Sequence, residues 1–398
     1  MISTQEALAV VLGQAPLFKK KLIQIPLQNS VGFLLSKDLK AQHNSPPFDQ
    51  SAMDGYALIY EDITSGGVIK FDPKNENSAG VSKIKKIEKG TAVRIFTGAK
   101  IPANADIVIP QENIQLTEDG ILVFDRNTVK KMDNIRLKGS QFKKGEVILH
   151  KNEKINSPRI AIAASAGYAK LPVYSFPKAS IIVSGNELIK PGQPLNGDKI
   201  YESNSLMLHA LLKEYKIPVN KILYTKDKKE SIRTAIHACL KNSELIFVSG
   251  GISVGKYDLV KESLLSLKVK TIFHKVKQKP GKPLYFGKKG NAFVFGLPGN
   301  PAASLTCFHE YVIPFIRSIC GEQEALSEIK KTQLITPYTK KPGLTHFLKG
   351  RLSEKGLSIL PDQESYKLTS FAYANCLIVI PEDSSEVKEG ELLEYHNI

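Results

Sequence analysis

Five loops rich in glycine, proline or charged residues each follow an apolar, strand-like segment between residues 179 and 301. Two of them contain a carboxylate, and a third is followed closely by one. Because the carboxyl ends of parallel strands meet at one edge of an open α/β sheet, we expect the loops to border a single crevice. Backbone N–H groups, carboxylates and lysines gathered there suit a phosphorylated ligand with a divalent metal. The loops are residues 184–187, 224–227, 249–255 (SGGISVG), 279–283 (KPGKP) and 297–301 (LPGNP).

The acidic residues expected at this edge are Glu187, Asp227 and Asp258, which are candidate catalytic groups and metal ligands. Each also has a structural interpretation: Glu187 and Asp227 as exposed loop acids, and Asp258 as the N-cap of the helix that follows it. Carboxylates crowded together repel one another unless a cation or a proton offsets their charge. This crowding favours a bound divalent metal, and Mg²⁺, for example, typically uses one or two protein carboxylates together with water and substrate phosphates.

Lys275, Lys279 and Lys282 place three ammonium groups within eight residues around a Pro-Gly turn. Strand alternation would put Lys275 and Lys279 on one face, where they could neutralise a phosphate or an oxyanion. The alternative is a solvated turn in a lysine-rich chain. His274, beside them, is interpreted as structural because no histidine-rich metal motif is present.

Bulk composition restricts the class of protein. The chain has 398 residues, with 42% hydrophobic and 24% charged residues, which indicates two to four globular domains. No apolar run is long enough to span a bilayer and the first residues do not resemble a signal peptide, so we expect a cytoplasmic protein. The net charge is +16, but only seven of the 55 basic residues are arginine and tryptophan is absent, which argues against nucleic-acid binding. Four scattered cysteines indicate neither disulfides nor a zinc site.

The pattern of elements predicts a multidomain α/β and β fold. Strands alternating with helical segments over residues 176–325 indicate a central three-layer α/β domain with a mostly parallel sheet. Short β-like runs predict an inserted β-rich domain at residues 45–145 and a C-terminal β-barrel at residues 326–398. Residues 1–44 and 146–175 are expected to form a stalk-like N-terminal domain.

Local signals also predict where helices begin within the α/β domain. Ser203 or Asn204 is expected to cap a helix that runs through Leu212. Pro301, at the end of LPGNP, suits the first turn of the next helix.

The loop motifs, together with SAMDGYA at residues 51–57, RIFTGA at 94–99 and PANADIVIPQE at 102–112, resemble the molybdopterin molybdenumtransferases, the family of MoeA and the E domain of gephyrin-type proteins. The match covers nearly the whole chain in the expected order. It implies an L-shaped homodimer of four-domain subunits, with the active site between the α/β domain of one subunit and the β domain of its partner. Its substrates would be adenylylated molybdopterin and molybdate, with Mg²⁺ bound and AMP released.

The resemblance also implies roles for individual residues. Asp54 and Thr97 would close the site from the partner's β domain. Glu187, Asp227 and Asp258 would form the acidic edge, and Lys275 and Lys279 would act in catalysis beside it. The substrate-binding residues would be Ser249, Gly250, Gly251, Ser253, Lys282, Pro298, Gly299, Asn300, Lys349 and Ser365.

Four positions depart from the family pattern: Gln141, Lys228, Lys349 and Glu364 stand where an acid, an aspartate, an arginine and a glycine are usual. Two alternatives to molybdenum insertion follow. One is a molybdopterin adenylyltransferase on the same α/β core, which is normally a single small domain. The other is a degraded paralogue or a scaffold for partner peptides. Other enzymes of cofactor synthesis are expected as further partners. The sequence does not determine whether molybdate or tungstate is preferred.

Overall fold

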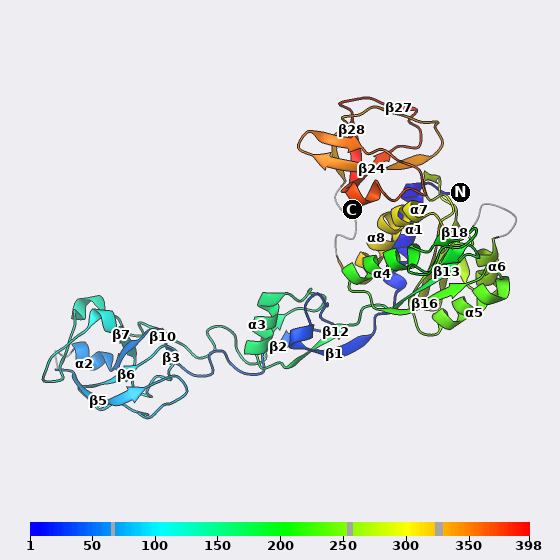
Figure 1. The fold of residues 1–398 in the computed structure, drawn as a ribbon. Coiled ribbons are helices and arrows are strands. Elements are labelled where there is room, and N and C mark those ends of the chain that lie inside the picture. Colours follow the sequence, from blue (N-terminus) through cyan, green and yellow to red (C-terminus); the bar gives the residue numbers. More distant parts are fainter. Residues whose placement is uncertain (65–67, 253–257, 323–328) are drawn as a thin grey trace. The chain divides into compact units, whose positions relative to one another are not determined.

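The structure, a computed structural model, describes residues 1–64, 68–252, 258–322 and 329–398. The chain divides into two compact units, one of Met1–Lys21 with Ser175–Ile398 and the other of Leu22–Tyr174 (Figure 1). None of the helices in the described residues is long and apolar enough to cross a membrane.

The first unit is built on a six-stranded sheet of order β16-β13-β17-β21-β20-β18 (Figure 1). The first four strands of this order are parallel to one another, and β20 is antiparallel to both of its neighbours. The sheet is therefore mostly parallel, as the alternation of strands and helices predicts. The strands are β13 (Ala179–Ser184), β16 (Val219–Thr225), β17 (Leu245–Ser249), β18 (Lys270–His274), β20 (Tyr285–Lys289) and β21 (Ala292–Leu297).

Alternate residues of the central strands enter two separate hydrophobic cores. Ile181 and Val183 of β13 belong to one core, whereas Ile182 between them belongs to the other. Because successive side chains of a strand point to opposite faces, both faces of the sheet must be covered, which gives three layers. The helices are α1 (Thr4–Gly13), α4 (Asn204–Glu214), α5 (Lys229–Leu240), α6 (Leu259–Ser266), α7 (Pro301–Cys307), the π-helix η5 (Phe308–Val312) and α8 (Ile313–Ile319). Pro301 is the first residue of α7, as expected.

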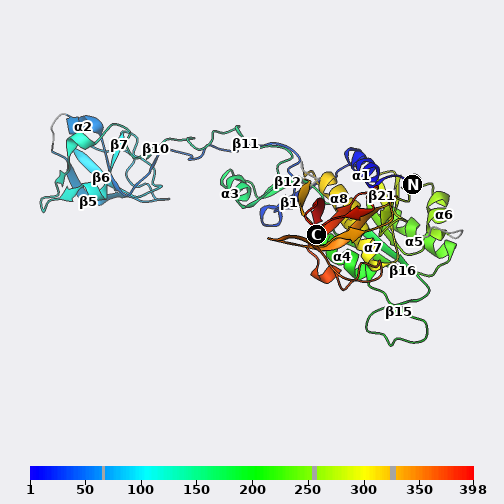
Figure 2. The ribbon, with the colours of Figure 1, turned by 90° about the horizontal axis from the view of Figure 1, so that it is seen from above.

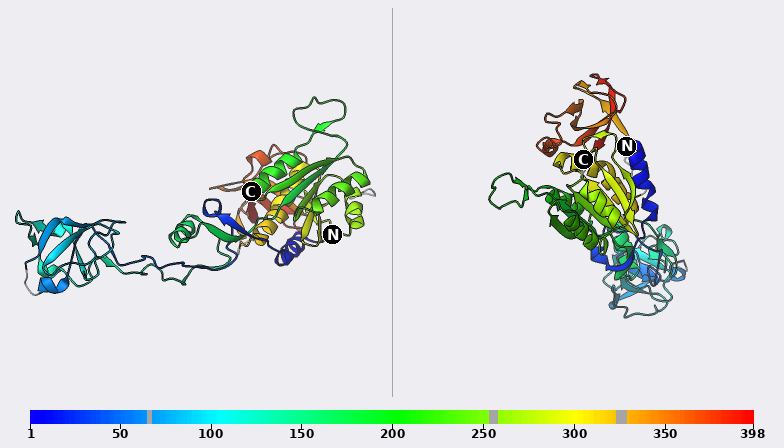
Figure 3. Two further views of the ribbon diagram at one scale, coloured as in Figure 1. Left: turned by 90° about the horizontal axis from the view of Figure 1, so that it is seen from below. Right: turned by 90° about the vertical axis from the view of Figure 1, so that its right-hand side faces the viewer.

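The N-terminal helix belongs to the α/β unit rather than to the stalk that we predicted for residues 1–44. Ala7 and Val11 of α1 are buried in the core that also contains Phe315 and Ile316 of α8. Figure 3 shows the dark blue N-terminal helix beside the rest of the first unit. Ser3 and Glu6 form a capping box that starts the helix. Sequence reasoning missed this placement because an amphipathic helix does not specify which apolar surface it covers.

The second unit contains two groups of paired strands. Near the chain junctions, β1 (Leu22–Pro26) pairs with β12 (Lys170–Tyr174), and β2 (Leu39–Lys40) pairs with β11 (Val147–Leu149). The inserted residues form a four-stranded sheet of order β5-β6-β4-β7. The other elements are α2 (Tyr60–Thr64), α3 (Ser157–Ser165), β3 (Gln50–Ser51), β4 (Gly55–Leu58), β5 (Lys70–Asn77), β6 (Thr91–Ile95), β7 (Ile107–Pro110), β8 (Gln115–Leu116), β9 (Leu122–Val123) and β10 (Ile135–Arg136).

The C-terminal residues form a β-sheet of order β19-β24-β26-β28-β22, in which β25 also pairs with β24. Among the described residues the predicted β-barrel is not confirmed: between β22 and β25 no strand pairing is formed, and one isolated bridge, Leu334–Leu357, joins β25 to the residue after β22. The strands are β19 (Gln278–Lys279), β22 (Lys330–Gln333), β24 (Thr345–Ser353), β25 (Gly356–Ile359), β26 (Cys376–Ile380) and β28 (Leu392–Asn397), beside a small pair of β23 (Tyr338–Thr339) and β27 (Glu386–Val387). The strand β19 comes from the KPGKP segment, so the α/β part contributes one strand to this sheet.

A short hairpin, β14 (Leu188–Ile189) with β15 (Ile200–Tyr201), follows the first of the five loops. Figure 2 shows the loop between these strands projecting beyond β16.

A histidine–glutamate pair joins the C-terminal sheet to the α/β part. The Nδ1 atom of His396, on β28, lies 2.8 Å from Oε2 of Glu310 in the π-helix, and its Nε2 atom lies 2.9 Å from Oε1 of Glu394. Burial alone would lower the pKa of His396, but the two carboxylates outweigh it and raise the pKa to about 10.

Replacing His396 with glutamine is expected to destabilise the first unit by on the order of 2 kcal/mol at neutral pH. Since the folded-state pKa is raised, the stabilisation is fully present below the unfolded value of 6.5 and is lost as pH rises toward about 10. Thermal unfolding of wild type and variant between pH 6 and 10 tests this, and the two melting curves should converge at high pH. As a control, His150→Gln removes a 71% exposed ring 4.0 Å from Asp38 and should change little. A constant difference across this pH range would contradict the prediction.

Candidate active site

The predicted loops meet at one edge of the six-stranded sheet. Ser184 and Thr225 lie opposite each other at the carboxyl ends of β13 and β16, and Ser249 and Leu297 do the same at the ends of β17 and β21. The strand β18, which ends at His274, runs in the same direction because β20 reverses between it and β21. Five strands therefore deliver their following loops to the same edge, as expected for a ligand crevice in such a sheet.

The loops approach each other so closely that only glycine fits. Gly250 has φ +85°, and a Cβ atom there would lie 2.1 Å from the carbonyl oxygen of Ser184. A Cβ at Gly251, where φ is +68°, would lie 2.9 Å from Cγ2 of Val260, and one at Gly299 would touch the Cα of Gly250. The SGG and LPGNP loops thus meet through backbone that carries no side chains at Gly250 and Gly299. Ser253 lies outside the described residues.

Asn204, at the start of α4, ties two of these loops together. Its Nδ2 atom donates to Ser249 Oγ at 2.8 Å and to the carbonyl oxygen of Gly299 at 2.7 Å. Because a carbonyl only accepts, the orientation of the amide is determined, and the buried Oδ1 atom has no hydrogen-bond partner in the described part of the chain. Sequence reasoning gave Asn204 or Ser203 only a capping role. The cap is in fact made by Glu202, whose Oε1 accepts from Ser205 N at 2.7 Å.

The carboxylates of the first two loops have different surroundings. Asp227 accepts a 2.5 Å hydrogen bond from Ser184 Oγ and a 3.2 Å bond from Asn186 N, so it holds the loop after β13 in place. Glu187, in that loop, is exposed. The structure therefore brings the Glu187 and Asp227 loops together, with Asp227 partly committed to protein donors.

Asp258 caps α6, as its structural interpretation predicts, and also keeps a free oxygen. Its Oδ1 accepts from Lys261 N at 2.9 Å, whereas Oδ2 lies 3.3 Å from Nε2 of His274. Both of these facing atoms are buried, and neither makes a hydrogen bond of good geometry to any residue that the structure describes. Burial lowers the pKa of His274, although Asp258 opposes that shift, so the ring is a weak countercharge. A buried carboxylate oxygen without a partner is costly unless a ligand satisfies it.

These carboxylates fit a magnesium site only in part. Across the described stretches of the chain, no three His, Cys, Asp or Glu side chains lie close enough to hold a metal ion. The free Oδ2 of Asp258 and the carboxylates of Asp227 and Glu187 are oxygen donors of the kind that Mg²⁺ prefers. A magnesium ion here would use one or two of them and complete its coordination with water and substrate phosphates. The set of all three as ligands stays a prediction.

The three lysines of the KPGKP region do not lie on one continuous strand, so the alternation argument was wrong. Lys275 has φ +73° and follows the end of β18, whereas Lys279 belongs to β19. Hydrogen bonds from Lys275 N to Leu284 O and from Val276 N to Lys282 O fold the segment into a narrow turn. Lys279 and Lys282 are exposed and Lys275 is half-buried. The turn still concentrates positive charge beside Asp258, because Lys275 directly follows His274.

Lys349, predicted to bind substrate, has its ammonium group committed to the protein. The residue is 3% exposed, and its Nζ donates to the carbonyl oxygens of Asp362, Glu364 (3.4 Å) and Lys367 (3.1 Å). Burial lowers the pKa of this ammonium, an effect that nearby carboxylates oppose. Gln363 adds further bonds, accepting from Lys349 N and donating to Lys349 O, both at 2.9 Å. Lys349 thus holds residues 362–367 around itself.

The loop held by Lys349 reaches the LPGNP loop through Ser365. The Oγ atom of Ser365 accepts a 2.8 Å hydrogen bond from Asn300 Nδ2. The neighbouring Pro298 accepts from Ser249 Oγ at 3.4 Å. Ser365, Asn300, Ser249 and Asn204 therefore lie in neighbouring loops joined by hydrogen bonds at the sheet edge, and the role of Ser365 in substrate binding stays a prediction.

Asp54 and Thr97 form a small site of their own in the second unit. The Oδ1 atom of Asp54 accepts from Thr97 N at 2.8 Å and from Thr97 Oγ1 at 2.7 Å. These bonds, first the one from the backbone, lower the pKa of Asp54, which is thus an exposed, ionised carboxylate. Gln141, one of the departures, accepts from Ser45 Oγ at 2.8 Å in the same unit. The SAMDGYA and RIFTGA motifs are therefore brought together by the fold.

The fold and the grouped loops define an α/β molybdopterin-binding protein with MoeA-type flanking regions. Residues 2–167 match the MoeA N-terminal region (domain I and II), residues 180–318 a probable molybdopterin binding domain, and residues 331–398 the MoeA C-terminal region (domain IV). A solved molybdopterin biosynthesis MoeA protein from Pyrococcus horikosii is similar at 28% identity and a TM-score of 0.81, covering 99% of this chain and 98% of its own.

Curated relatives agree across the full length. The molybdopterin molybdenumtransferase of Staphylococcus epidermidis is 32% identical over 400 residues, covering 99% of this chain and 94% of the relative. The enzyme of the same name from Staphylococcus aureus is 31% identical over 402 residues, with the same coverage. The chain belongs to the molybdopterin molybdenumtransferase family, and it is a transferase of molybdenum cofactor biosynthesis.

Proposed function

We propose that this transferase inserts molybdenum from molybdate into adenylylated molybdopterin and releases AMP. The observation that carries the proposal is the meeting of the five loops at one sheet edge, where a buried carboxylate oxygen of Asp258 makes no hydrogen bond to any of the described residues and faces only the His274 ring. We further propose a homodimer in which Asp54 and Thr97 of one subunit complete the edge of the other. A cytoplasmic location and contacts with other enzymes of cofactor synthesis stay predictions from the sequence.

The residues at the edge suit a reaction whose difficulty is placing two anions side by side. Backbone N–H groups around Gly250, Gly251 and Gly299 would receive the nucleotide phosphate, because glycine lets the backbone approach it. Lys275, Lys279 and Lys282 would offset the negative charge of phosphate and oxyanion. Bound magnesium would supply further charge neutralisation at the phosphates.

Positioning follows from the polar connections between loops. Asn204 holds Ser249 and Gly299, and Asn300 holds Ser365, so groups from both sheets of the unit keep fixed places. Fixed placement of two reactants lowers the barrier by removing the entropy cost of bringing them together. The arrangement needs little proton transfer from side chains.

Replacing Asp258 with asparagine tests the proposal, since asparagine keeps an oxygen that can cap α6 but removes the charge. We expect molybdate-dependent AMP release from adenylylated molybdopterin to fall at least about a hundredfold, equivalent to about 3 kcal/mol, with the melting temperature nearly unchanged. Asp119→Asn, in a turn of the second unit, serves as the charge control and should keep full activity. Wild-type binding of both substrates without AMP release would reject the insertion reaction and support the degraded-paralogue or scaffold alternative.

The adenylyltransferase alternative predicts a single domain on the α/β core. The matches of residues 2–167 and 331–398 to MoeA regions oppose it. Incubation with free molybdopterin and ATP should therefore give no adenylylated product.

A further inference from the structure

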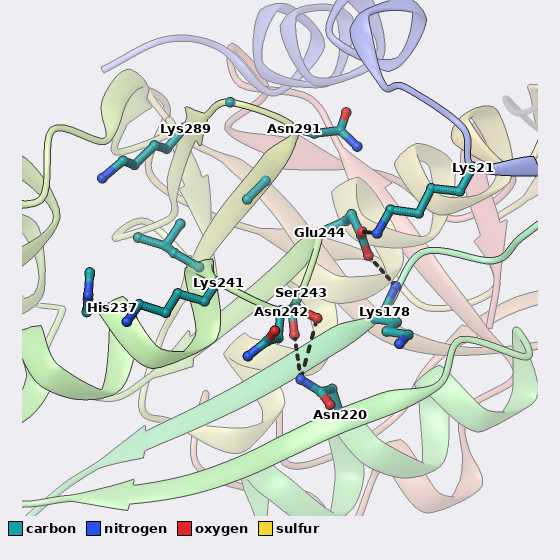
Figure 4. Close-up of a pocket in the computed structure, with 13 residues that line it drawn as sticks. Lys21, Lys178, Asn220, His237, Lys241, Asn242, Ser243, Glu244, Lys289 and Asn291 are labelled. Atoms are coloured by element: carbon teal, nitrogen blue, oxygen red, sulfur yellow. Dashed lines mark hydrogen bonds and ion pairs between the residues drawn. The ribbon is translucent and has the colours of Figure 1, made fainter.

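A polar pocket lies at the edge of the six-stranded sheet opposite the candidate active site (Figure 4). It is lined by residues at the amino-terminal ends of β13, β16, β17 and β21, together with the last turn of α5 and the end of β20. All of these residues belong to the first unit, and the cavity has a volume of about 690 Å³. The pocket is therefore separate from the five loops that follow the strands.

The pocket has an excess of positive charge. Lys21, Lys178, Lys241 and Lys289 line it, against a single carboxylate. That carboxylate, Glu244, is already committed: Oε1 pairs with Lys21 Nζ at 2.6 Å, and Oε2 accepts from the backbone N of Lys178 at 2.8 Å. Four lysines against one glutamate leave three positive charges around the cavity, before any charge on His237.

Several of the cationic groups have no protein partner for their charge. Among the residues that the structure describes, the ammonium groups of Lys178 and Lys241 make no hydrogen bond or ion pair. Lys289 donates to the carbonyl oxygen of Leu267 at 2.6 Å, which leaves its charge uncompensated. Figure 4 shows Lys241 beside His237 on one wall of the pocket and Lys178 beside Glu244 on another. Donors therefore surround the cavity from more than one side.

The negative end of the α5 helix dipole explains the positions of only some of the cationic groups in the pocket. His237 lies in the last turn of α5 and Lys241 is its C-cap, where cations are favourable. Lys178 and Lys289, however, come from the ends of strands and have no helix terminus to offset. Their convergence on the same cavity indicates a ligand that carries negative charge.

The walls also restrict the chemistry of the ligand. No Phe, Tyr or Trp side chain lines the cavity, so a base or another flat ring would find no stacking partner except the imidazole ring of His237. Asn220 and the buried Ser243 add neutral polar groups, joined by a long bond of 3.4 Å from Nδ2 to Oγ. The volume lies within the range of small-molecule sites, and ammonium groups are common ligands of phosphate. We propose that this pocket binds a small phosphorylated molecule carrying at least two negative charges.

Titration calorimetry with inorganic pyrophosphate tests the proposal on the full chain. The background is Lys279→Ala/Lys282→Ala, which weakens any binding at the candidate active site. We expect this background to bind one equivalent of pyrophosphate. Adding Lys178→Ala/Lys241→Ala should weaken the affinity at least about tenfold, the effect of losing one charge-assisted hydrogen bond or more.

The matched control adds Lys213→Ala/Lys388→Ala instead, which removes the same charge from exposed positions outside the pocket. It should change the affinity less than about twofold, because the net positive charge of the chain acts only weakly at physiological salt. Equal weakening by both pairs, or no binding in the background, would overturn the proposal. So would tighter binding of citrate or of a glutamate-rich peptide than of pyrophosphate. Melting temperatures of all variants confirm that each chain is folded.

Discussion

Replacing Lys349 with methionine is expected to lower kcat/KM for molybdenum insertion at least about a hundredfold. Methionine has a similar length but removes three hydrogen bonds from the ammonium group to the carbonyls of residues 362–367. Hydrogen bonds from charged groups contribute about 1.5–3 kcal/mol each, so loss of this tether should release the loop that holds Ser365 at Asn300. Lys349 would then act as a positioning residue and not as a ligand of the oxyanion.

A double-mutant cycle with Ser365→Ala distinguishes these two roles. If Lys349 acts through the loop, the Lys349→Met effect should largely disappear once Ser365 is alanine. Direct binding of the oxyanion by both residues would instead make the two losses add. Lys367→Met is the control, because this lysine lies in the same loop but pairs at the surface with Asp362 at 2.5 Å. It should retain most of the activity.

The Lys349→Arg variant tests whether position 349 needs only a positive charge or the compact shape of an ammonium group. Three carbonyls around one nitrogen suit the compact ammonium group, whereas a guanidinium spreads its donors over a planar fork. We expect the arginine variant to show a raised KM for molybdate with a smaller change in kcat. Arginine activity equal to wild type, together with an inactive methionine variant, would mean that charge alone is needed at this position.

Replacing Gly250 with alanine is expected to disrupt the active-site edge, lowering kcat/KM at least about a hundredfold. The new Cβ atom would lie 2.1 Å from the carbonyl oxygen of Ser184, so the SGG loop and the end of β13 would have to separate. The loss of stability should exceed about 3 kcal/mol, since strain in the backbone and a steric clash both contribute.

Gly192 provides a matched control for the backbone conformation alone. Its φ of +87° is close to the +85° of Gly250, but a Cβ there would meet nothing within 4 Å. Gly192→Ala should therefore cost only the strain of a positive φ, about 1–2 kcal/mol, and leave activity intact. Thermal unfolding and steady-state kinetics on both variants check this. Equal losses at the two positions would show that the contact between loops is unimportant.

The sequence by itself determined the class of fold and which loops carry the chemistry. Alternating strands and helices predicted a mostly parallel sheet, and parallel strands necessarily bring their following loops to one edge. Gly250 and Gly251 of SGGISVG and Pro301 of LPGNP are local signals. The glycines permit a backbone conformation that other residues rarely adopt, and the proline suits the first turn of a helix. The family followed from several specific motifs in the expected order, because any one of these motifs alone would have been weak evidence.

Only the tertiary structure decided what each polar side chain contacts. Lys349 and Asn204 show the difference. The ammonium group of Lys349, which the family resemblance assigned to substrate, is bonded to backbone carbonyls of its own chain. Asn204, expected as a helix cap, links Ser249 to Gly299. The placement of α1 in the core of the α/β part was missed for the same reason. Local patterns specify backbone conformation, whereas hydrogen-bond partners depend on segments far apart in the chain that only packing brings together.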